Sequence, residues 1–157
     1  MIAYIGIGSN LGNRRKNIRV AIELLKKDKN IRLIKKSRIY ETEPLGGPLQ
    51  GKYLNAVLKI DTGCLPRNLL GKFKAIESAL GRQPISIKWA PRPIDLDILF
   101  YGRRVIKSGK LTIPHPEIKN RIFVLKPLTE IAPGFIHPVY KKTAKKLLKE
   151  YEAGQKD

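Results

Sequence analysis

Residues 89–100 read Trp-Ala-Pro-Arg-Pro-Ile-Asp-Leu-Asp-Ile-Leu-Phe, and their alternation of apolar and acidic side chains predicts a β-strand from residue 94 onward. Side chains two residues apart on a strand point to the same side, so Asp95 and Asp97 project from one face, with their Cα atoms roughly 7 Å apart. The opposite face is apolar and is predicted to pack in the core; it carries Ile94, Leu96, Ile98 and Phe100. The predicted strand thus has one face that packs in the core and an opposite face that carries two carboxylates.

The two carboxylates repel each other unless a positive group lies between them. Mg²⁺ takes carboxylate and phosphate oxygens as ligands, so Asp95 and Asp97 predict a magnesium site. Arg92, just upstream, is a candidate phosphate clamp. The alternative is an exposed strand face on which both carboxylates meet surface lysines, and the spacing alone leaves the two interpretations open.

Composition predicts an ordinary globular domain spanning residues 1–157. Hydrophobic residues make up 42% of the chain, which argues against disorder. No apolar run approaches the roughly 18 residues of a membrane span, and we expect no signal peptide and no membrane association. The single cysteine, Cys64, cannot form an internal disulfide, which favours a reducing, cytoplasmic setting.

The charge is unusual, because 32 Lys and Arg residues against 13 Asp and Glu residues give a net charge of +19. Such a field attracts polyanions and nucleotide phosphates. Much of the excess lies in short lysine runs, which are either solvated surface or part of a site for an anionic ligand.

The order of predicted elements is β-α-β-β-α-β, an α+β, ferredoxin-like antiparallel sheet with both helices on one face and the ligand site on the other. The expected strands cover residues 2–8, 31–41, 53–61 and 94–100, and the helices cover residues 13–28 and 66–80. Pro66 suits the first helical turn and Gly81 suits a C-terminal cap. The tail is less clear: we expect a hairpin ending near 105–107, partial helix over 117–131 with Pro127 bending or interrupting it, and a helix over 143–152.

The sheet face opposite the helices has the composition of a ligand-binding floor. Gly6 and Gly8 leave the first strand bare on this side, and the third strand contributes Tyr53 and Asn55. A flat ring, an amide and the carboxylate pair together predict a binding site. The alternative is an ordinary solvent face with one tyrosine on it, and His115, between two prolines, is likewise either a structural or a functional residue.

Several short motifs occur in an order and spacing that resemble those of the hydroxymethyl-dihydropterin pyrophosphokinases, a family of folate biosynthesis. The resemblance covers residues 2–135 approximately. Its motifs are Gly8-Ser9-Asn10, Tyr53-Leu54-Asn55, Gly81-Arg82, Trp89-x-Pro91-Arg92-x-Ile94-Asp95-Leu96-Asp97-Ile98-Leu99, Pro114-His115-Pro116 and Arg121-x-Phe123-Val124-Leu125-x-Pro127-Leu128-x-Glu130.

The resemblance implies transfer of pyrophosphate from ATP to the hydroxymethyl oxygen of the pterin, leaving AMP. It implies two Mg²⁺ ions on Asp95 and Asp97, with Arg82 and Arg92 meeting the charge that develops on the transferred group. The residues implied for the pterin are Thr42, Leu45, Tyr53, Asn55, Trp89 and Phe123. Those implied for ATP are Glu77, Arg82, Arg92, Ile98, Lys110, Thr112, His115 and Arg121.

Two positions depart from the family pattern, because Lys88 and Pro84 stand where an arginine and a basic residue are common. Lysine cannot make a bidentate contact, so these changes bear on the grip on the nucleotide. They leave the metal pair unchanged.

The rival class is a nucleic-acid-binding module, since a ferredoxin-like sheet with exposed aromatic rings can stack RNA bases and +19 supplies attraction. Two carboxylates on the binding face count against it. We therefore expect a monomeric enzyme acting on small molecules, with nucleic acid at most a weak electrostatic partner.

Overall fold

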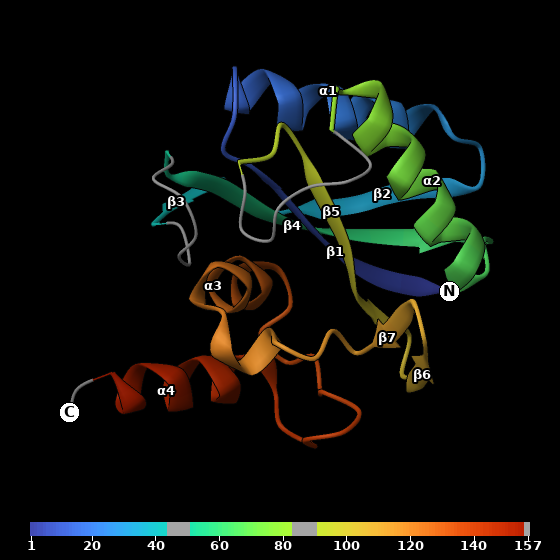
Figure 1. Ribbon diagram of the computed structural model, residues 1–157. Coiled ribbons are helices and arrows are strands. Elements are labelled where there is room, and N and C mark those ends of the chain that lie inside the picture. The colour runs from blue at the N-terminus through green and yellow to red at the C-terminus, as the bar shows by residue number, and fades with distance from the viewer. Residues whose placement is uncertain (44–50, 83–90, 156–157) are drawn as a thin grey trace.

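The computed structural model describes residues 1–43, 51–82 and 91–155, and within them a five-stranded antiparallel sheet has helices on both faces (Figure 1). The first elements are β1 (Ile2–Ser9), α1 (Arg14–Lys27), β2 (Ile31–Lys36), β3 (Tyr40–Thr42), β4 (Tyr53–Thr62), α2 (Pro66–Ala79) and β5 (Asp95–Tyr101). The strand order is β2-β4-β1-β5, with β3 also paired to β4. The expected ferredoxin-like arrangement is confirmed.

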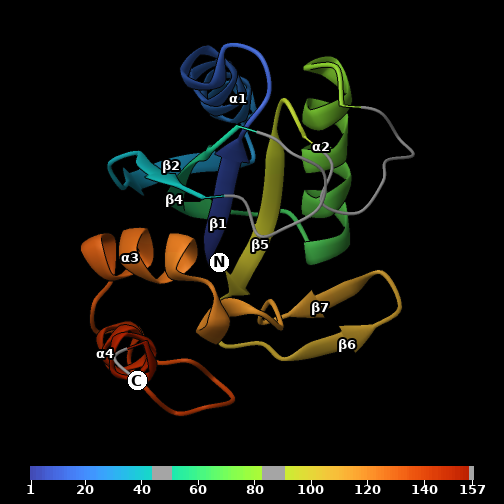
Figure 2. The ribbon, with the colours of Figure 1, turned by 60° about the vertical axis from the view of Figure 1, so that its left-hand side comes forward.

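Helices α1 and α2 lie side by side on one face of the sheet (Figures 1 and 2). The Asn13 side chain caps α1 by accepting a hydrogen bond from the Lys16 backbone N–H at 3.1 Å. Pro66 opens α2, and Gly81 follows its end with a φ of 93°, as the sequence predicts. The buried stripe of α1 packs on the apolar side chains of β1, β4 and β5; it consists of Ile18, Ala21, Ile22 and Leu25.

The last third of the chain builds a second layer on the opposite face, which the sequence left undetermined. Its elements are the 3₁₀ turn η1 (Ile118–Asn120), α3 (Ile122–Ile131) and α4 (Ala144–Gly154). The hairpin of β6 (Ile106–Ser108) and β7 (Leu111–Ile113), which lies between β5 and η1 in the chain, instead packs Leu111 and Ile113 into the core that α1 and α2 cover. Helix α3 runs through Pro127 and is not interrupted there. The two helices cover the half of this face around Tyr4, Val57 and Phe100, and leave the half near Gly8 free of helix. The part of this face that the helices leave open is therefore narrower than the sequence predicts.

The predicted face of Phe100 on β5 is wrong, because the strand contains one extra residue. Ile5 pairs with Ile98 but Tyr4 pairs with Phe100, so Leu99 is an extra residue that forms a β-bulge. The bulge reverses the alternation, and Phe100 packs edge-on to Tyr4 in the second core instead of joining Ile98 in the first.

The expected strand 31–41 is divided into β2 and β3. At the break, the Ser37 side chain accepts the hydrogen bond of the Val57 backbone N–H at 2.9 Å, in the place of a main-chain partner. Ser37 also donates through its backbone N–H to the Val57 carbonyl, so the chain stays beside β4 and resumes pairing at Tyr40.

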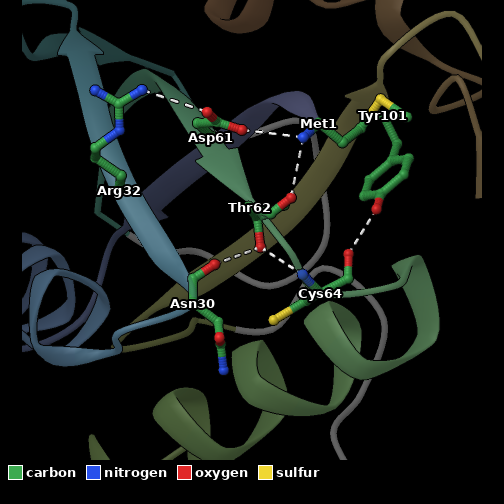
Figure 3. Close-up of polar contacts among 7 residues, drawn as sticks. All are labelled: Met1, Asn30, Arg32, Asp61, Thr62, Cys64 and Tyr101. Carbon is green, nitrogen blue, oxygen red and sulfur yellow. Dashed lines mark hydrogen bonds and ion pairs between the residues drawn. The ribbon is translucent and has the colours of Figure 1, made fainter.

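The end of the sheet far from Gly8 is closed by a polar network (Figure 3). The Met1 amino group binds Asp61, which also pairs with Arg32. Tyr101 donates its hydroxyl hydrogen to the Cys64 carbonyl at 2.6 Å. No helix in the described ranges is long and apolar enough to cross a membrane.

Candidate active site

A pocket of about 210 Å³ lies over the middle of the sheet, where β1 has two glycines facing the second layer. The register sets Gly8 between Asn55 of β4 and Asp95 of β5, and sets Gly6 opposite Asp97. A Cβ atom on Gly8 would stand 2.7 Å from the Asn55 Oδ1 atom, which is closer than real Cβ contacts. The absence of side chains on β1 therefore creates the space that its neighbours line, as the sequence predicts.

The described part of the chain brings together eight of the predicted site residues in this pocket. They are Thr42, Tyr53, Asn55, Arg92, Asp95, Asp97, Arg121 and Phe123. The sequence assigned no role to the remaining lining residues apart from the glycines: Ile7, Glu43, Ala56, Leu99 and Val124. Val124 could not be predicted, because it reaches the pocket only through the packing of α3 on the sheet, which is a tertiary contact.

One end of the pocket is aromatic and amide-bearing. Tyr53 at the start of β4 and Phe123 in the first turn of α3 both line it. Between these elements, the Asn55 amide donates a hydrogen bond to the Thr42 hydroxyl at 2.8 Å, which fixes the orientation of the amide. Burial raises the pKa of Tyr53, so its phenol stays neutral. This end suits a flat heterocycle with polar edges.

The other end carries opposed charges. The Arg82 guanidinium lies 2.6 Å from Glu77 and 2.8 Å from Asp95, and Arg92 lies 3.5 Å from the second oxygen of Asp95. Glu77 is 6% exposed and also accepts a hydrogen bond from the Leu96 backbone N–H at 2.9 Å. Burial raises the pKa of Glu77. The hydrogen bonds from Arg82 and Leu96 satisfy its carboxylate, which lies beneath the pocket and does not line it.

Of the two carboxylates on β5, Asp95 pairs with arginines, whereas Asp97 forms no ion pair with another described residue. Burial first, and then the neighbouring Asp95, raise its pKa to about 7. A cation between the two carboxylates would relieve this repulsion. No group of three or more acidic, His or Cys side chains that could hold a metal gathers among the described residues. A divalent ion at Asp95 and Asp97 would therefore need further oxygens, which is how Mg²⁺ binds with phosphate groups and water. The residues present fit such an ion.

His115 lies outside the pocket, beside the bulge of β5. Its backbone N–H donates to the Leu99 carbonyl at 3.1 Å, and its Nδ1 atom accepts from the Glu117 N–H at 3.2 Å. Burial first, and then the charge of Arg121, lower the pKa of His115 to about 4, so the ring is neutral near pH 7 with its hydrogen on Nε2.

Other predicted residues are not brought to the pocket. Lys110 and Thr112 belong to the β6–β7 hairpin, and the Ile98 side chain is buried in the core under α1 and α2. Leu45 and Trp89 lie outside the described residues, as do Lys88 and Pro84.

Asn10 supports a residue of the pocket, although the sequence assigned it no role beyond its place in the Gly8-Ser9-Asn10 motif. Its side-chain oxygen accepts from the Arg92 N–H at 2.7 Å, and its own N–H donates to the Arg92 carbonyl at 3.0 Å. This pair ties the end of β1 to the backbone of Arg92. Its signal in the sequence is a polar residue placed directly after a strand that ends at the site.

Comparison with known families gives one match over most of the chain. Residues 4–133 match the family model described as 7,8-dihydro-6-hydroxymethylpterin-pyrophosphokinase (HPPK). The 2-amino-4-hydroxy-6-hydroxymethyldihydropteridine pyrophosphokinase of Aquifex aeolicus is 44% identical over 147 residues, covering 94% of this chain and 90% of its own length. The protein of the same name from Bacillus subtilis is 43% identical over 83% of this chain and 77% of its own.

Larger proteins contain a similar segment. The folic acid synthesis protein fol1 of Pneumocystis carinii is 48% identical over 87% of this chain, but the match spans only 18% of that protein. A Plasmodium falciparum HPPK-DHPS crystal structure with pteroate has a TM-score of 0.80 at 17% identity; it covers 99% of this chain and 43% of that one. The structural likeness supports the fold, and this chain spans less than half of that structure.

Proposed function

Because this chain belongs to the 7,8-dihydro-6-hydroxymethylpterin-pyrophosphokinase family and is a pyrophosphokinase of folate biosynthesis, we propose how its site performs the transfer. The substrates implied by the family are ATP and 6-hydroxymethyl-7,8-dihydropterin. The observation that carries the proposal is the register of β1, which sets an amide and two carboxylates on opposite sides of a glycine-lined pocket.

In this reaction the pterin hydroxymethyl oxygen attacks the β-phosphorus of ATP. The bond from that phosphorus to the oxygen bridging the α- and β-phosphates breaks, AMP leaves with that oxygen, and the hydroxyl proton is released. Little covalent work falls to the protein, which acts by positioning the two substrates and by stabilising charge.

The aromatic end of the pocket is proposed to bind the pterin. Tyr53 and Phe123 stack on its ring system, and Asn55, oriented by Thr42, forms hydrogen bonds with its polar edge. A flat ring held between two aromatic side chains keeps the hydroxymethyl group directed toward the carboxylates.

The charged end is proposed to bind the polyphosphate. Arg82 and Arg92 pair with Asp95 in this structure, and phosphate oxygens would take over part of those contacts. Arg121 lines the pocket. Neutral His115 lies outside the pocket and would donate from Nε2 to a phosphate oxygen only where the polyphosphate extends beyond it. Glu77 holds Arg82 from below and is a positioning residue.

Asp95 and Asp97 are proposed to hold Mg²⁺, two ions being expected, together with ATP oxygens. The metal, when bound, neutralises negative charge on the polyphosphate and so favours attack by the hydroxyl. We also propose that the chain works as a monomer in the cytoplasm, a setting that suits its buried free thiol, Cys64.

AMP release from ATP tests the reaction. We expect AMP only when the hydroxymethyl-dihydropterin and Mg²⁺ are both present, and no AMP after EDTA is added. AMP formed at the same rate without the pterin, or unaffected by EDTA, would contradict the proposal.

Replacing either carboxylate tests the metal site. Asp95→Asn and Asp97→Asn are expected to lower kcat by at least about 100-fold, because the loss of a ligand charge weakens stabilisation of the transferring group. The melting temperature of Asp97→Asn should stay near or above that of the unmodified chain, since it removes one of two repelling charges, whereas Asp95→Asn also loses ion pairs with Arg82 and Arg92 and should melt at a lower temperature. Glu150→Gln, which alters a carboxylate on α4 paired with Lys142, is the control. Near-normal turnover in both aspartate variants would rule out the metal role.

A further inference from the structure

The short strand β3 is held from the second layer by one carboxylate. Glu130, in the last turn of α3, accepts a hydrogen bond from the Tyr40 hydroxyl at 2.5 Å. The same carboxylate accepts from the Arg38 backbone N–H at 3.1 and 3.2 Å, and the Arg38 guanidinium lies 3.4 Å away. These residues are about 90 positions apart in the chain, so the contact joins two layers that no local structure would join.

The protonation states suit this contact. Burial alone would raise the pKa of Glu130, but the bonds from Tyr40 and Arg38 outweigh it and lower that pKa. Burial and the Glu130 carboxylate raise the pKa of Tyr40. A neutral phenol therefore donates to an ionised carboxylate, which is a strong type of hydrogen bond.

Strand β3 carries part of the pocket wall. Tyr40 pairs with Asn55 across the strands, and Thr42 pairs with Tyr53. Thr42 also accepts the hydrogen bond of the Asn55 amide. Any shift of β3 along or away from β4 thus changes the orientation of the amide that faces the pocket.

The other end of β3 is held by α1. One nitrogen of the Arg14 guanidinium lies 3.1 Å from Glu41 and donates to the Lys52 carbonyl at 2.8 Å. This contact fixes the end of β3 against the start of β4. At the Tyr40 end, the Glu130 carboxylate adds a side-chain contact to the hydrogen bonds that Ser37 makes with Val57.

Helix α3 joins this anchor to the aromatic end of the pocket. Phe123 and Glu130 are seven residues apart, which is about two turns, so both lie on the side of α3 that faces the sheet. The helix packs on β4 and touches β3. A single helix therefore positions a ring on one side of the pocket and, through β3, the amide on the other.

We propose that Glu130, acting through Tyr40, is a positioning residue that sets the Thr42–Asn55 pair for recognition of the pterin. This inference rests on the proposed pterin pocket. It adds a specificity-determining contact outside the pocket, made by residues that touch neither substrate.

The test compares Tyr40→Phe, Glu130→Ala and Glu130→Gln with two matched controls on α4, Tyr151→Phe and Glu150→Gln. Steady-state kinetics give KM for each substrate, and thermal melting gives stability. We expect Tyr40→Phe and Glu130→Ala to raise KM for the pterin roughly three- to tenfold, with KM for ATP and kcat within about twofold. The effect is modest because the Glu130 side chain is 27% exposed.

Two further results belong to the expected pattern. Glu130→Gln should recover most of the pterin affinity, because its amide oxygen still accepts from the phenol. The double variant Tyr40→Phe, Glu130→Ala should be no worse than Glu130→Ala alone, since that single change already removes the contact with Tyr40. The two controls should leave both KM values unchanged.

Asn55→Ala separates failure of this inference from failure of the pocket. If Asn55→Ala raises the pterin KM selectively but Tyr40→Phe and Glu130→Ala do not, the positioning role is wrong and the pocket stands. If the anchor variants raise both KM values equally, or lower the melting temperature without changing either, Glu130 is only structural and the inference is overturned. If Asn55→Ala has no selective effect, the proposed pocket and the inference both fall.

Discussion

At the scale of single residues, Gly6 and Gly8 differ in how much room each has for a side chain. A Cβ on Gly6 would stand 3.4 Å from the nearest Leu99 methyl carbon, whereas a Cβ on Gly8 would stand 2.7 Å from Asn55 Oδ1 and 3.3 Å from the Leu54 carbonyl oxygen. The neighbour of Gly6 is a flexible side chain, whereas the neighbours of Gly8 include a backbone oxygen. Both glycines clear the pocket floor, but only Gly8 is required by its immediate contacts.

We therefore predict that Gly8→Ala lowers the free energy of unfolding by roughly 1–3 kcal/mol, because the Asn55 amide and the β4 backbone must shift. Gly6→Ala, the matched control, should change it by less than about 0.5 kcal/mol. Urea denaturation of both variants without ligands makes the measurement. Equal stability of the two variants would show that the close approach of Asn55 is not a constraint.

His137 is a second residue whose environment has a measurable consequence. It is 4% exposed, stacks on Tyr140, and accepts at Nδ1 from the backbone N–H groups of Val139 and Tyr140. Burial lowers the pKa of His137 to about 4. The ordinary value in an unfolded chain is about 6.5. Between these values the unfolded chain binds a proton that the folded chain does not.

Stability should therefore fall as pH is lowered from about 6.5 to about 4, by up to about 1.4 kcal/mol per pH unit from this residue. His137→Gln keeps a hydrogen-bond acceptor but cannot be protonated, so its stability curve should be flatter over that window. Denaturant titrations at pH 7, 6, 5 and 4.5 compare the two slopes. Parallel curves would mean that His137 is protonated in the folded chain. The variant also isolates His137 from His115, whose pKa is lowered as well.

At the scale of elements, α3 is the helix on which the pocket and the second core both depend. Its Leu128 is 0% exposed within a cluster that includes Tyr4, Val57 and Leu99. Lys126 lies on the same helix but is exposed. Substitutions at Leu128 and Lys126 therefore compare a buried position of α3 with a surface position.

Leu128→Ala is expected to destabilise the protein by about 2–4 kcal/mol, through lost burial and the cavity that remains. Lys126→Ala should change stability by no more than about 0.5 kcal/mol. Thermal or urea unfolding makes the comparison. A small loss for Leu128→Ala would indicate that α3 is only loosely packed on β4.

Much of the sheet could be predicted from the sequence, because period-two alternation fixes which side chains share a face. It set Asp95 and Asp97 on one face of β5 and Tyr53 and Asn55 on one face of β4. The bulge at Leu99 could not be seen, since Leu99 and Phe100 are both apolar and a shift of phase between them leaves the pattern unchanged.

Other features depend on contacts between distant parts of the chain. The division of the expected strand 31–41 arises from one hydroxyl, that of Ser37, taking a backbone partner. The positions of α3 and of the Glu130–Tyr40 contact follow from packing across the sheet, which no local pattern encodes. Most of the residues that line the pocket could therefore be predicted from the sequence, and the contacts that hold them in place could not.

At the scale of the whole molecule, the net charge of +19 means that most basic side chains have no acidic partner. Most acidic side chains in the described ranges already form ion pairs, for example Glu23 with Lys26, Asp28 with Lys72 and Glu150 with Lys142. The remaining cations repel one another, which destabilises the compact state. Salt screens this repulsion.

We predict that raising NaCl from about 20 mM to about 200 mM increases the melting temperature by roughly 2–4 °C. The double variant Lys145→Glu, Lys149→Glu lowers the net charge from +19 to +15, since each change removes two units, and should show a smaller salt effect. Both lysines are exposed on α4. A melting temperature that falls with salt would mean that attractive ion pairs outweigh the repulsion.

The extra residue at Leu99 has a consequence for how such a protein can diversify. Upstream of it, β5 keeps its phase with the glycines of β1, so the spacing of the two carboxylates is inherited as a unit. Downstream of it, the strand follows the opposite phase and serves the second layer through Phe100. Substitutions downstream of the bulge, at Phe100 for example, therefore leave Asp95 and Asp97 on their face of the strand, whereas exchange of α3 would also change the pocket that Phe123 and Val124 line. The bulge thus lets one strand present both carboxylates to the pocket and Phe100 to the second core on the same side of the sheet.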